Sequence, residues 1–228
     1  MAKQLTVAIT GAASGIGRAT AEAMATRGFH LALVDVSAEA LEKATKACGK
    51  EKSAGFVCDV TDETAVTITW KHIRERLGFV DVLVNCAGIA RYAPFEELAP
   101  AEWRRMFEVN VMGPVLFTRA ALPEMVAKRR GTIINVGSHR GIEPKIGTSA
   151  YSASKAALLG MTRAVAAEVG SQGVKVSYLA PGGTNTGLGT PPDSRFMRPS
   201  AIAQAILFIC EAEDNAWVRD LVVLPLGV

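Results

Sequence analysis

The segment LTVAITGAASGIG, residues 5–17, joins a run of strand-forming residues to a cluster of three glycines. Its first part, 5–10, predicts a buried β-strand, and Gly11, Gly15 and Gly17 fall at the turn into a helix that opens near Gly15. Glycines at such a turn let a pyrophosphate approach backbone N–H groups, and the positive end of the helix dipole favours the anion. The spacing Gly-x-x-x-Gly-x-Gly differs from the commoner Gly-x-Gly-x-x-Gly. Because glycine turns also serve packing, the cluster alone leaves both interpretations open.

Asp35 favours the interpretation as a dinucleotide site. It ends the second strand-forming run, HLALVD (30–35), and lies 18 residues after Gly17. An acid about 20 residues beyond the glycines hydrogen-bonds the adenosine ribose and repels a 2′-phosphate. The alternative is that Asp35 caps the following helix, although Ser37 is better placed to do so. Arg18 lies inside the helix start and is not directed at that pocket, so we expect NAD to be preferred over NADP.

Strand and helix patterns alternate along the whole chain. Strand-forming runs occur at 5–10, 30–35, 54–60, 81–85, 131–138, 174–181 and 220–225. Helix-forming stretches begin near Gly15 and continue at 37–48, 62–78, 101–130 (with a bend expected at Gly113-Pro114), 148–169 and 200–212. This alternation, with nearly continuous apolar strands, predicts an α/β fold: a doubly wound parallel sheet of about seven strands with helices on both faces. No repeat or linker divides the chain, so we expect one domain, 1–228.

Composition and charge exclude several classes of function. The formal net charge is only +3, and the densest basic run, 128–130, is too short to indicate nucleic-acid binding. The four cysteines form no Cys-x-x-Cys pair and have no histidines at zinc spacing, so we expect reduced thiols and no metal site. The N-terminal residues lack the apolar core of a signal peptide, and no apolar run reaches the ~20 residues that span a bilayer. We therefore expect a cytoplasmic protein without a membrane segment.

A tyrosine and a lysine stand four positions apart in TSAYSASKAALLGMTRAVAAEV, residues 148–169. Residues at this spacing share one face of a helix, so Tyr151 and Lys155 are expected to approach each other. Taken alone, they could be a surface pair whose polar ends reach solvent. Ser138, thirteen positions before Tyr151 and at the end of the fifth strand, favours proton-transfer chemistry instead.

These motifs resemble, in order along the chain, those of the short-chain dehydrogenase/reductase family. The resemblance rests on the glycine loop with Asp35, NCAG (85–88), Asn110, Ser138, YSASK (151–155) and PGGTNT (181–186). It covers essentially the whole chain. It implies a Rossmann-like fold, a nicotinamide dinucleotide, and hydride transfer between NAD(H) and a secondary alcohol/ketone pair. It also implies a homodimer or homotetramer.

The resemblance implies four catalytic residues: Asn110, Ser138, Tyr151 and Lys155. Tyr151 is the expected general acid/base. Because an unperturbed tyrosine has a pKa of ~10, the Lys155 ammonium and the oxidised nicotinamide are expected to favour its phenolate. Lys155 is also expected to reach the cofactor ribose. Ser138 would hold the substrate oxygen against Tyr151, and Asn110 would support a water that leads protons outward.

The resemblance also implies cofactor-binding residues on the glycine loop, the strand ends and the segment after the sixth strand. They are Gly11, Ser14, Gly15, Ile16, Gly17, Asp35, Asp59, Val60, Asn85, Ala87, Gly88, Tyr151, Lys155, Pro181, Gly182, Thr184 and Thr186. Cys86 stands where the family has a second asparagine, so some local hydrogen bonding is expected to be lost. Gly183 beside Gly182 predicts a mobile wall next to the nicotinamide.

Two loops expected at the carboxyl edge of the sheet carry candidate substrate-binding residues. They are Arg91, His139, Arg140 and Lys145. Together they would make a basic mouth for a carboxylate or phosphate, whereas the alternative is solvated loop charges, one of them balanced by Glu143. The Gly-, Pro- and Thr-rich stretch 182–199 predicts a short lid around 183–199 and an open site for a small alcohol or carbonyl substrate.

Two other functions fit part of the pattern. The extended epimerase–dehydratase relatives also carry Tyr-x-x-x-Lys, but they usually show a different glycine spacing and a long C-terminal substrate domain. The second alternative is a non-catalytic dinucleotide-sensing or interaction module on the same fold. It predicts loss of the serine, tyrosine or lysine, and this chain keeps Ser138, Tyr151 and Lys155.

Overall fold

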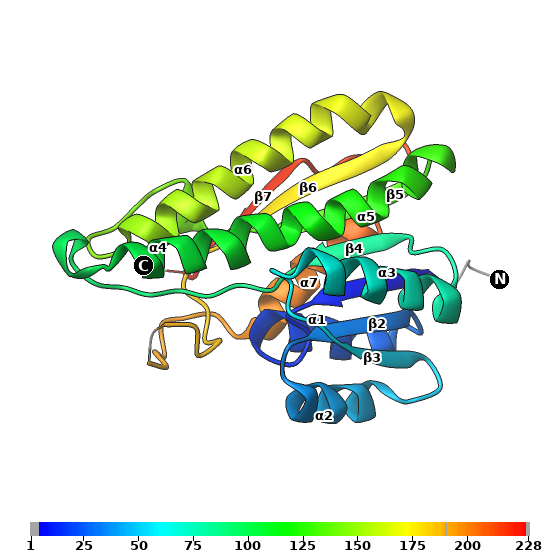
Figure 1. Cartoon of the computed structure of the whole chain (residues 1–228), viewed down its shortest axis with the longest axis horizontal. Helices are drawn as coiled ribbons and strands as arrows, with labels where there is room; N and C mark the ends of the chain where they lie inside the picture. Colours follow the sequence, from blue (N-terminus) through cyan, green and yellow to red (C-terminus); the bar gives the residue numbers. More distant parts are fainter. Residues whose placement is uncertain (1–4, 190, 227–228) are drawn as a thin grey trace.

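A seven-stranded sheet forms the centre of the molecule (Figure 1). The computed structural model describes residues 5–189 and 191–226. All strands are parallel and lie in the order β3-β2-β1-β4-β5-β6-β7. Their bounds are β1 Thr6–Thr10, β2 His30–Asp35, β3 Ser53–Val57, β4 Val82–Asn85, β5 Gly131–Val136, β6 Val174–Pro181 and β7 Asp220–Val223.

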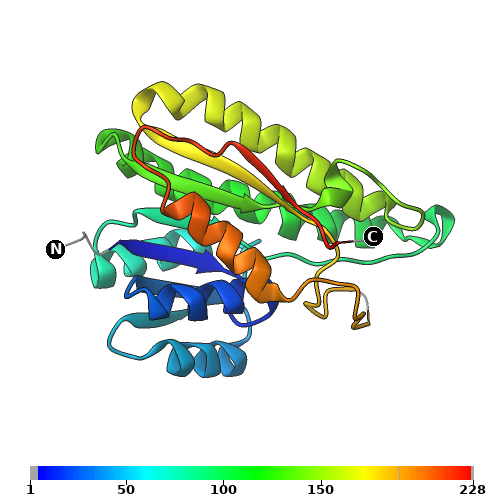
Figure 2. The ribbon, with the colours of Figure 1, turned by 180° about the vertical axis from the view of Figure 1, so that it is seen from behind.

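Helices cover both faces of the sheet. One face carries α1 (Gly15–Thr26), α2 (Ala38–Cys48) and α7 (Pro199–Cys210), which are in front in Figure 2. The other carries α3 (Glu63–Leu77), α5 (Gly113–Ala127) and α6 (Ser149–Val169), with α4 (Pro100–Phe107) at the end of α5 (Figure 1). Short 3₁₀ turns lie at Phe95–Glu97, His139–Gly141 and Gly170–Gln172.

The central strands are buried on both faces, which is why they are apolar throughout rather than alternating. In β1, Val7 and Ile9 belong to the core that packs against α1 and α7, whereas Ala8 belongs to the core against α3 and α5. All three residues are fully buried. This division sets the register, because a shift by one residue would exchange the two faces.

The structure confirms the predicted α/β fold, a doubly wound parallel sheet, although several boundaries differ, two of them near the site. β3 ends at Val57, earlier than expected, and the break between α4 and α5 falls in a π-helical turn, Glu108–Met112. Gly113 and Pro114 instead form the first turn of α5, where the missing N–H of proline costs little. The π turn contains Asn110, which is fully buried. Such turns are frequent at functional sites.

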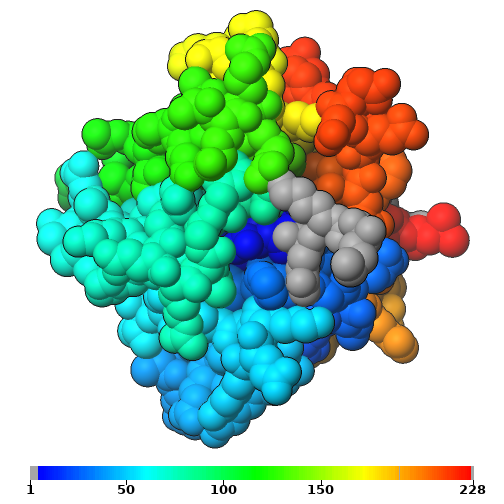
Figure 3. Space-filling model, turned by 90° about the vertical axis from the view of Figure 1, so that its right-hand side faces the viewer, coloured from blue at the N-terminus to red at the C-terminus, as the bar shows by residue number. Residues whose placement is uncertain are grey.

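The strand order reverses at β1, which has β2 on one side and β4 on the other. In open α/β sheets, ligands bind beside such a point, at the carboxyl ends of the strands. Figure 3 shows the opposite end of the molecule, at the amino ends of the strands, where segments from all parts of the chain are visible. Over residues 5–189 and 191–226, no helix has the length and apolarity needed to cross a membrane.

Candidate active site

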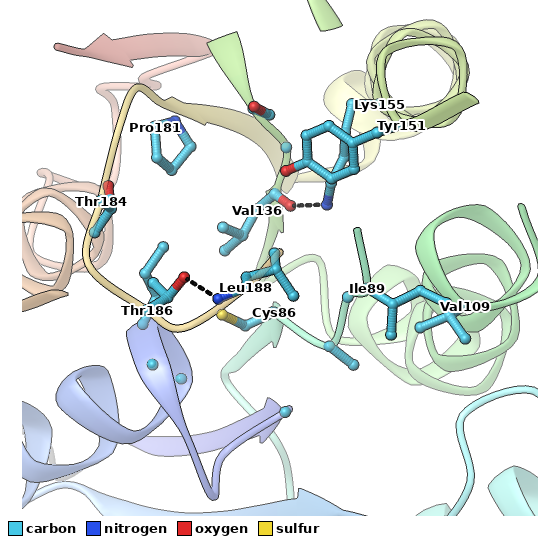
Figure 4. Close-up of a pocket in the computed structure, with 18 of the residues that line it drawn as sticks. Cys86, Ile89, Val109, Val136, Tyr151, Lys155, Pro181, Thr184, Thr186 and Leu188 are labelled. Atoms are coloured by element: carbon cyan, nitrogen blue, oxygen red, sulfur yellow. Dashed lines mark hydrogen bonds between the residues drawn. The ribbon is translucent and has the colours of Figure 1, made fainter. Parts of the chain in front are cut away.

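A cavity of about 720 Å³ lies at the carboxyl ends of the strands. In Figure 4, Tyr151 and Lys155 project toward it from α6, and Pro181, Thr184 and Thr186 lie across from them. Most predicted site residues line this cavity. They are Gly11, Ser14, Gly15, Ile16, Gly17, Asp35, Asp59, Val60, Ala87, Gly88, Ser138, His139, Arg140, Lys145, Tyr151, Lys155, Pro181, Gly182, Thr184 and Thr186. Three other predicted residues, Asn85, Arg91 and Asn110, lie outside the lining that the described residues form.

The glycine loop has a backbone geometry that side chains would prevent. Gly15, with φ +50°, is in the left-handed region at the start of α1. At Gly17 the reason is close approach, since a Cβ there would lie 2.1 Å from the carbonyl oxygen of Gly11. Ser14 makes no side-chain cap, and the first turn of α1 holds no acidic residue. This helix end is therefore suited to an anion such as a pyrophosphate.

Asp35 is held at the end of β2 by two backbone groups. Its Oδ2 accepts a hydrogen bond from Ala13 N and its Oδ1 accepts one from Ser37 N, each at 3.0 Å. Ser37, as expected, caps α2 with its side chain. Arg18 donates to Glu22 on the same helix at 2.8 Å and does not line the cavity. The carboxylate of Asp35 thus lies at the edge of the glycine loop and is not paired with Arg18.

The wall after β3 combines a charged and an apolar residue. Asp59 Oδ1 accepts from the N–H and the hydroxyl of Thr61, at 2.9 and 2.7 Å, and these bonds hold the pKa of the carboxyl below its usual range. Arg105 of α4 lies 3.5 Å from Asp59 and also lines the cavity. Val60 packs so closely on α5 that a Cβ on Gly113 would lie 2.8 Å from it.

The turn after β4 is bonded to the end of β1. Thr10 Oγ1 accepts from Cys86 N and Ala87 N, each at 3.1 Å, so the turn is held without the amide that Cys86 replaces. Cys86 lines the cavity, and burial raises the pKa of its thiol to about 12, which keeps it neutral. Asn85, predicted to bind the cofactor, donates to Asn135 Oδ1 of the neighbouring strand β5 at 2.8 Å.

The predicted serine, tyrosine and lysine meet on one wall of the cavity. Tyr151 is only 6% exposed and Lys155 4%, which excludes the interpretation as a surface pair. Lys155 Nζ donates to Val136 O at 2.9 Å and lies 5.9 Å from the centroid of the Tyr151 ring (Figure 4). Ser138 follows β5, and its Oγ accepts from Arg140 N at 3.1 Å.

Burial controls the protonation of this tyrosine and lysine. It raises the pKa of Tyr151, and a hydrogen bond from Ser138 and the charge of Arg140 oppose that shift only in part. Burial also lowers the pKa of Lys155 to about 8. The expected effect of Lys155 on the pKa of Tyr151 stays a prediction: here the ammonium bonds the Val136 carbonyl, and burial is the largest influence on the pKa of the phenol.

Asn110 holds the segment after β4 against α6. Its Oδ1 accepts from Ile89 N and its Nδ2 donates to Ile89 O, both at 2.9 Å, and Nδ2 also donates to Ser154 Oγ at 3.0 Å. A Cβ on Gly88 would lie 3.2 Å from Asn110 Oδ1 and 3.6 Å from Lys155 Nζ. The amide therefore sets the position of the cavity wall from behind rather than lining it.

The segment after β6 is tightly packed, which corrects the expectation that Gly182 and Gly183 make it mobile. A Cβ on Gly182 would lie 2.9 Å from the Pro225 side chain, and one on Gly183 would lie 2.5 Å from the Phe196 ring. Gly183 O also accepts from Met197 N at 2.9 Å. Neither glycine is among those with positive φ. Close packing, not conformational freedom, explains both.

The side chain of Asn185 bonds two backbone groups within the predicted lid. Its Nδ2 donates to Asp193 O at 2.8 Å and its Oδ1 accepts from Asp193 N at 2.9 Å. Thr186 Oγ1 accepts from Leu188 N at 3.2 Å on the cavity side (Figure 4). Residue 190 of the lid, and residues 1–4 and 227–228 of the predicted domain, lie outside the described residues.

Three of the four predicted mouth residues line the cavity: His139, Arg140 and Lys145. The fourth, Arg91, donates to Glu102 at 3.2 Å instead. Arg140 donates to the backbone carbonyl of Glu143 at 3.0 Å, while the Glu143 carboxylate lies 3.5 Å from His139. The Glu143 carboxylate therefore contacts His139 rather than Arg140 or Lys145.

Sequence reasoning missed two tyrosines. Tyr92 lines the cavity and packs edge-to-face on Tyr151, with ring centroids 5.6 Å apart. Tyr178 lies behind Ser138, in a strand, VKVSYLAP, whose other buried residues are small or aliphatic. That contrast in size was visible in the sequence, but only the fold shows what the ring contacts. In the described part of the chain, no group of three His, Cys, Asp or Glu could hold a metal ion.

The geometry fits a dinucleotide. The cavity extends along the glycine loop, the acid at the end of β2 and the tyrosine–lysine pair, and the loop excludes side chains by the positive φ of Gly15 and the close backbone approach at Gly17. These features define an oxidoreductase that binds a nicotinamide dinucleotide on a Rossmann-like sheet. The chain belongs to the short-chain dehydrogenase family, whose family model matches residues 5–194.

Relatives with assigned activities cover nearly the whole chain. The D-threitol dehydrogenase of Mycolicibacterium smegmatis is 36% identical, over 91% of this chain and 85% of its own. The cis-4-hydroxycyclohexanecarboxylate dehydrogenase of Sinomonas cyclohexanicum is 38% identical, over 91% and 89%. Both names describe oxidoreductases acting on hydroxyl compounds.

Solved structures agree with this assignment. An alcohol dehydrogenase from Thermococcus sibiricus, complexed with 5-hydroxy-NADP, has a TM-score of 0.93 and 27% identity, covering 99% of this chain and 98% of its own. A 3-ketoacyl-(acyl-carrier-protein) reductase from Brucella melitensis, complexed with NADH, has a TM-score of 0.91 and 29% identity, covering 97% of each chain. The neighbours thus carry both kinds of nicotinamide dinucleotide.

Proposed function

We propose that this protein is an NAD-dependent oxidoreductase that transfers a hydride between NAD(H) and a secondary alcohol/ketone pair. The observation that carries the proposal is the buried pair Tyr151 and Lys155 beside Ser138, in the same cavity as the glycine loop. A buried tyrosine and lysine at a cavity wall have a cost in desolvation that a purely structural site does not require. Relatives that act on hydroxyl compounds support the reaction type.

In this proposal Tyr151 is the general acid/base. Its hydroxyl faces the cavity (Figure 4), takes the alcohol proton during oxidation and donates it to the carbonyl oxygen during reduction. Burial keeps the phenol protonated, which is the form that donates. When bound, the cofactor supplies or accepts the hydride and, in its oxidised form, adds a positive charge that favours the phenolate.

The neighbouring residues position the substrate oxygen and stabilise the charge that develops on Tyr151. Ser138 holds the substrate oxygen by its hydroxyl. Lys155, with a pKa lowered by burial to about 8, stabilises the phenolate as it forms and exchanges protons near neutral pH. Asn110 acts through Ile89 and Ser154, which it holds in place.

Asp35 is proposed to select NAD over NADP. It lines the cavity at the edge of the glycine loop, and its carboxylate accepts a ribose hydroxyl but repels a 2′-phosphate. Arg18, a cation that could offset this repulsion, is paired with Glu22. The choice of coenzyme therefore rests on this chain's own residues, since its neighbours carry either form.

The first test is titration of the purified protein with NADH and with NADPH, followed by nicotinamide fluorescence, and then a panel of secondary alcohols and ketones. We expect tight NADH binding, weak NADPH binding and turnover of at least one panel member. Binding without turnover would favour the non-catalytic dinucleotide-sensing module. Binding of neither coenzyme would contradict the proposal at the glycine loop.

The substrate is proposed to carry a carboxylate beside its hydroxyl or keto group. Arg140 and Lys145 line the cavity; burial raises the pKa of both Tyr92 and Tyr151, and the charge of Arg140 partly opposes that rise at each, as a guanidinium near the reacting hydroxyl would. The relative that acts on cis-4-hydroxycyclohexanecarboxylate supports this class.

Paired substrates test the carboxylate. For cis-4-hydroxycyclohexanecarboxylate and its neutral carboxamide, Arg140→Gln should raise KM for the acid at least tenfold and leave the amide unchanged. Arg91→Gln is the matched control, because Arg91 is a neighbouring loop cation paired with Glu102 outside the cavity. Equal kinetics for acid and amide in the unmodified protein would contradict a carboxylate site.

We also propose a homodimer or homotetramer of this domain, 1–228, in the cytoplasm. β7 is an edge strand, and Phe208 of α7 with Val222 and Leu224 at β7 leave apolar side chains 60%, 45% and 48% exposed. Such faces are commonly covered by symmetric association. The four free thiols support a reducing compartment. Light scattering at micromolar concentration tests the assembly, and a monomer mass would contradict it.

A further inference from the structure

The hydroxyl of Tyr178 joins two segments that carry proposed catalytic residues. It accepts a hydrogen bond from Ser138 N at 3.1 Å, and Ser138 O and Lys155 O each lie 3.2 Å from it as acceptors. A phenol has one proton, so the two carbonyls share it. All three partners are backbone atoms, which means that the phenol fixes where the chain runs at Ser138 and at Lys155.

Two glycines make room for this ring. A Cβ on Gly137 would lie 2.0 Å from Tyr178 Cζ, and one on Gly141 would lie 2.9 Å from the Tyr178 hydroxyl oxygen and 2.7 Å from the Lys155 carbonyl carbon. Gly137, before the short 3₁₀ turn after β5, and Gly141, the last residue of that turn, therefore both pack directly on Tyr178. Neither glycine has positive φ, so space for the ring and for α6 is what excludes a side chain.

The phenol stays a donor across the working range of pH. Tyr178 is only 1% exposed, and burial raises its pKa to about 12. The charged groups that act on it, Asp220 of β7 and Arg163 of α6, have opposite effects and are paired with each other at 3.2 Å. The hydroxyl is therefore neutral and fixed, as a geometric support has to be.

We propose that Tyr178 is a positioning residue that sets the catalytic geometry by bridging the backbone of Ser138 to that of Lys155. This inference rests on the proposed function. The catalytic groups come from two separate segments, a loop after β5 and helix α6, and their relative position decides whether the Ser138 and Tyr151 hydroxyls reach one substrate oxygen. Misplacement by about 1 Å can cost a hundredfold in rate. The hydroxyl, rather than the ring, carries this role, because a phenylalanine would fill the same space.

The test compares Tyr178→Phe with Ser177→Ala. Each variant removes one fully buried hydroxyl from adjacent residues of β6, but the Ser177 hydroxyl donates to Val218 O at 2.6 Å, away from the catalytic segments. We expect Tyr178→Phe to lower kcat at least tenfold, with NADH affinity and KM changed less than threefold. We also expect the pH profile of kcat to shift to higher pH in Tyr178→Phe. The hydrogen bond from Ser138 acts to lower the pKa of Tyr151, and a displaced Ser138 would weaken that bond. Ser177→Ala should keep both kcat and the profile.

Two further measurements keep the inference separate from its premise. Amide hydrogen exchange of residues 137–141 needs no turnover, and Tyr178→Phe should accelerate exchange at Ser138 N while Ser177→Ala does not. Gly137→Ala should lower kcat by displacing the ring, and adding Tyr178→Phe should lower it little further, because both act on one contact. Unchanged exchange and unchanged kcat in Tyr178→Phe would overturn the inference. Turnover absent from the unmodified protein would instead contradict the proposed function, and exchange would still report on the bridge.

Discussion

The ammonium group of Lys155 donates to the backbone carbonyl of Val136, at 2.9 Å, and so ties the second turn of α6 to the end of β5. The lysine is 4% exposed, and burial lowers its pKa to about 8. A buried cation held by a single carbonyl is costly, because its lost hydration is only partly replaced. The site therefore keeps a charge that weakens the fold, which is common where chemistry requires it.

Substitution of Lys155 should expose this cost as a dependence on pH. Between pH 8 and 10.5 the unfolded chain holds a proton on Lys155 that the folded chain has lost, so stability rises with pH in that window. Lys155→Met lacks this pH-dependent contribution to stability, because methionine does not titrate. Its free energy of unfolding, relative to the unmodified protein, should be highest below pH 8 and fall by about 3 kcal/mol by pH 10. Urea unfolding at pH 7.5 and pH 10 measures this, and parallel pH curves for the two proteins would contradict the buried ammonium.

Removal of the proposed acid/base should separate binding from chemistry. Tyr151→Phe keeps the ring that packs on Tyr92 and removes only the hydroxyl. NADH affinity should stay within about threefold while kcat falls by at least 10², the usual contribution of general acid–base catalysis. Tyr92→Phe is the matched control, a second cavity phenol without an acid/base role, and should retain most activity. Equal losses in the two variants would argue against a special role for Tyr151.

The preference for NAD should depend on Asp35 and not on Arg18. Asp35→Ala should weaken NADH binding and reduce discrimination against NADPH at least tenfold, about 1.4 kcal/mol, because the repelling carboxylate is gone. Arg18→Ala should leave the ratio unchanged, since Arg18 is bonded to Glu22. Fluorescence titration of both variants with both coenzymes measures the ratio. An Asp35→Ala ratio equal to that of the unmodified protein would show that the acid does not select the coenzyme.

Substitution by alanine should change the stability of the protein in opposite directions at two helical glycines. A Cβ on Gly17 would lie 2.1 Å from the Gly11 carbonyl oxygen, so Gly17→Ala should displace the glycine loop, lower stability by more than about 2 kcal/mol and weaken NADH binding. Gly160, inside α6, has no atom within 4 Å of the same position. Gly160→Ala should therefore stabilise the protein by about 0.5–1 kcal/mol through helix propensity, with binding unchanged. Thermal unfolding with and without NADH compares them.

Much of the fold could be predicted because it depends on local patterns of apolar and polar residues. Continuous apolar runs such as 30–35 and 174–181 predict strands buried on both faces, and both bounds agree with β2 and β6. The break between α4 and α5 was misplaced, because the π turn at Glu108–Met112 depends on the bonds of Asn110 to Ile89 and Ser154, residues distant in the sequence. Local propensity contains no record of such partners.

By itself, the sequence determined the parallel α/β fold, the glycine turn with its acid, and the shared face of Tyr151 and Lys155, because each depends on spacing along one segment. Only the tertiary structure decided which atom Lys155 bonds, that Arg91 pairs outside the cavity, and that Gly137 leaves space for the ring of Tyr178. These are contacts between segments brought together by packing. Close packing fixes them to within a fraction of an ångström, a precision that no pattern along the chain contains.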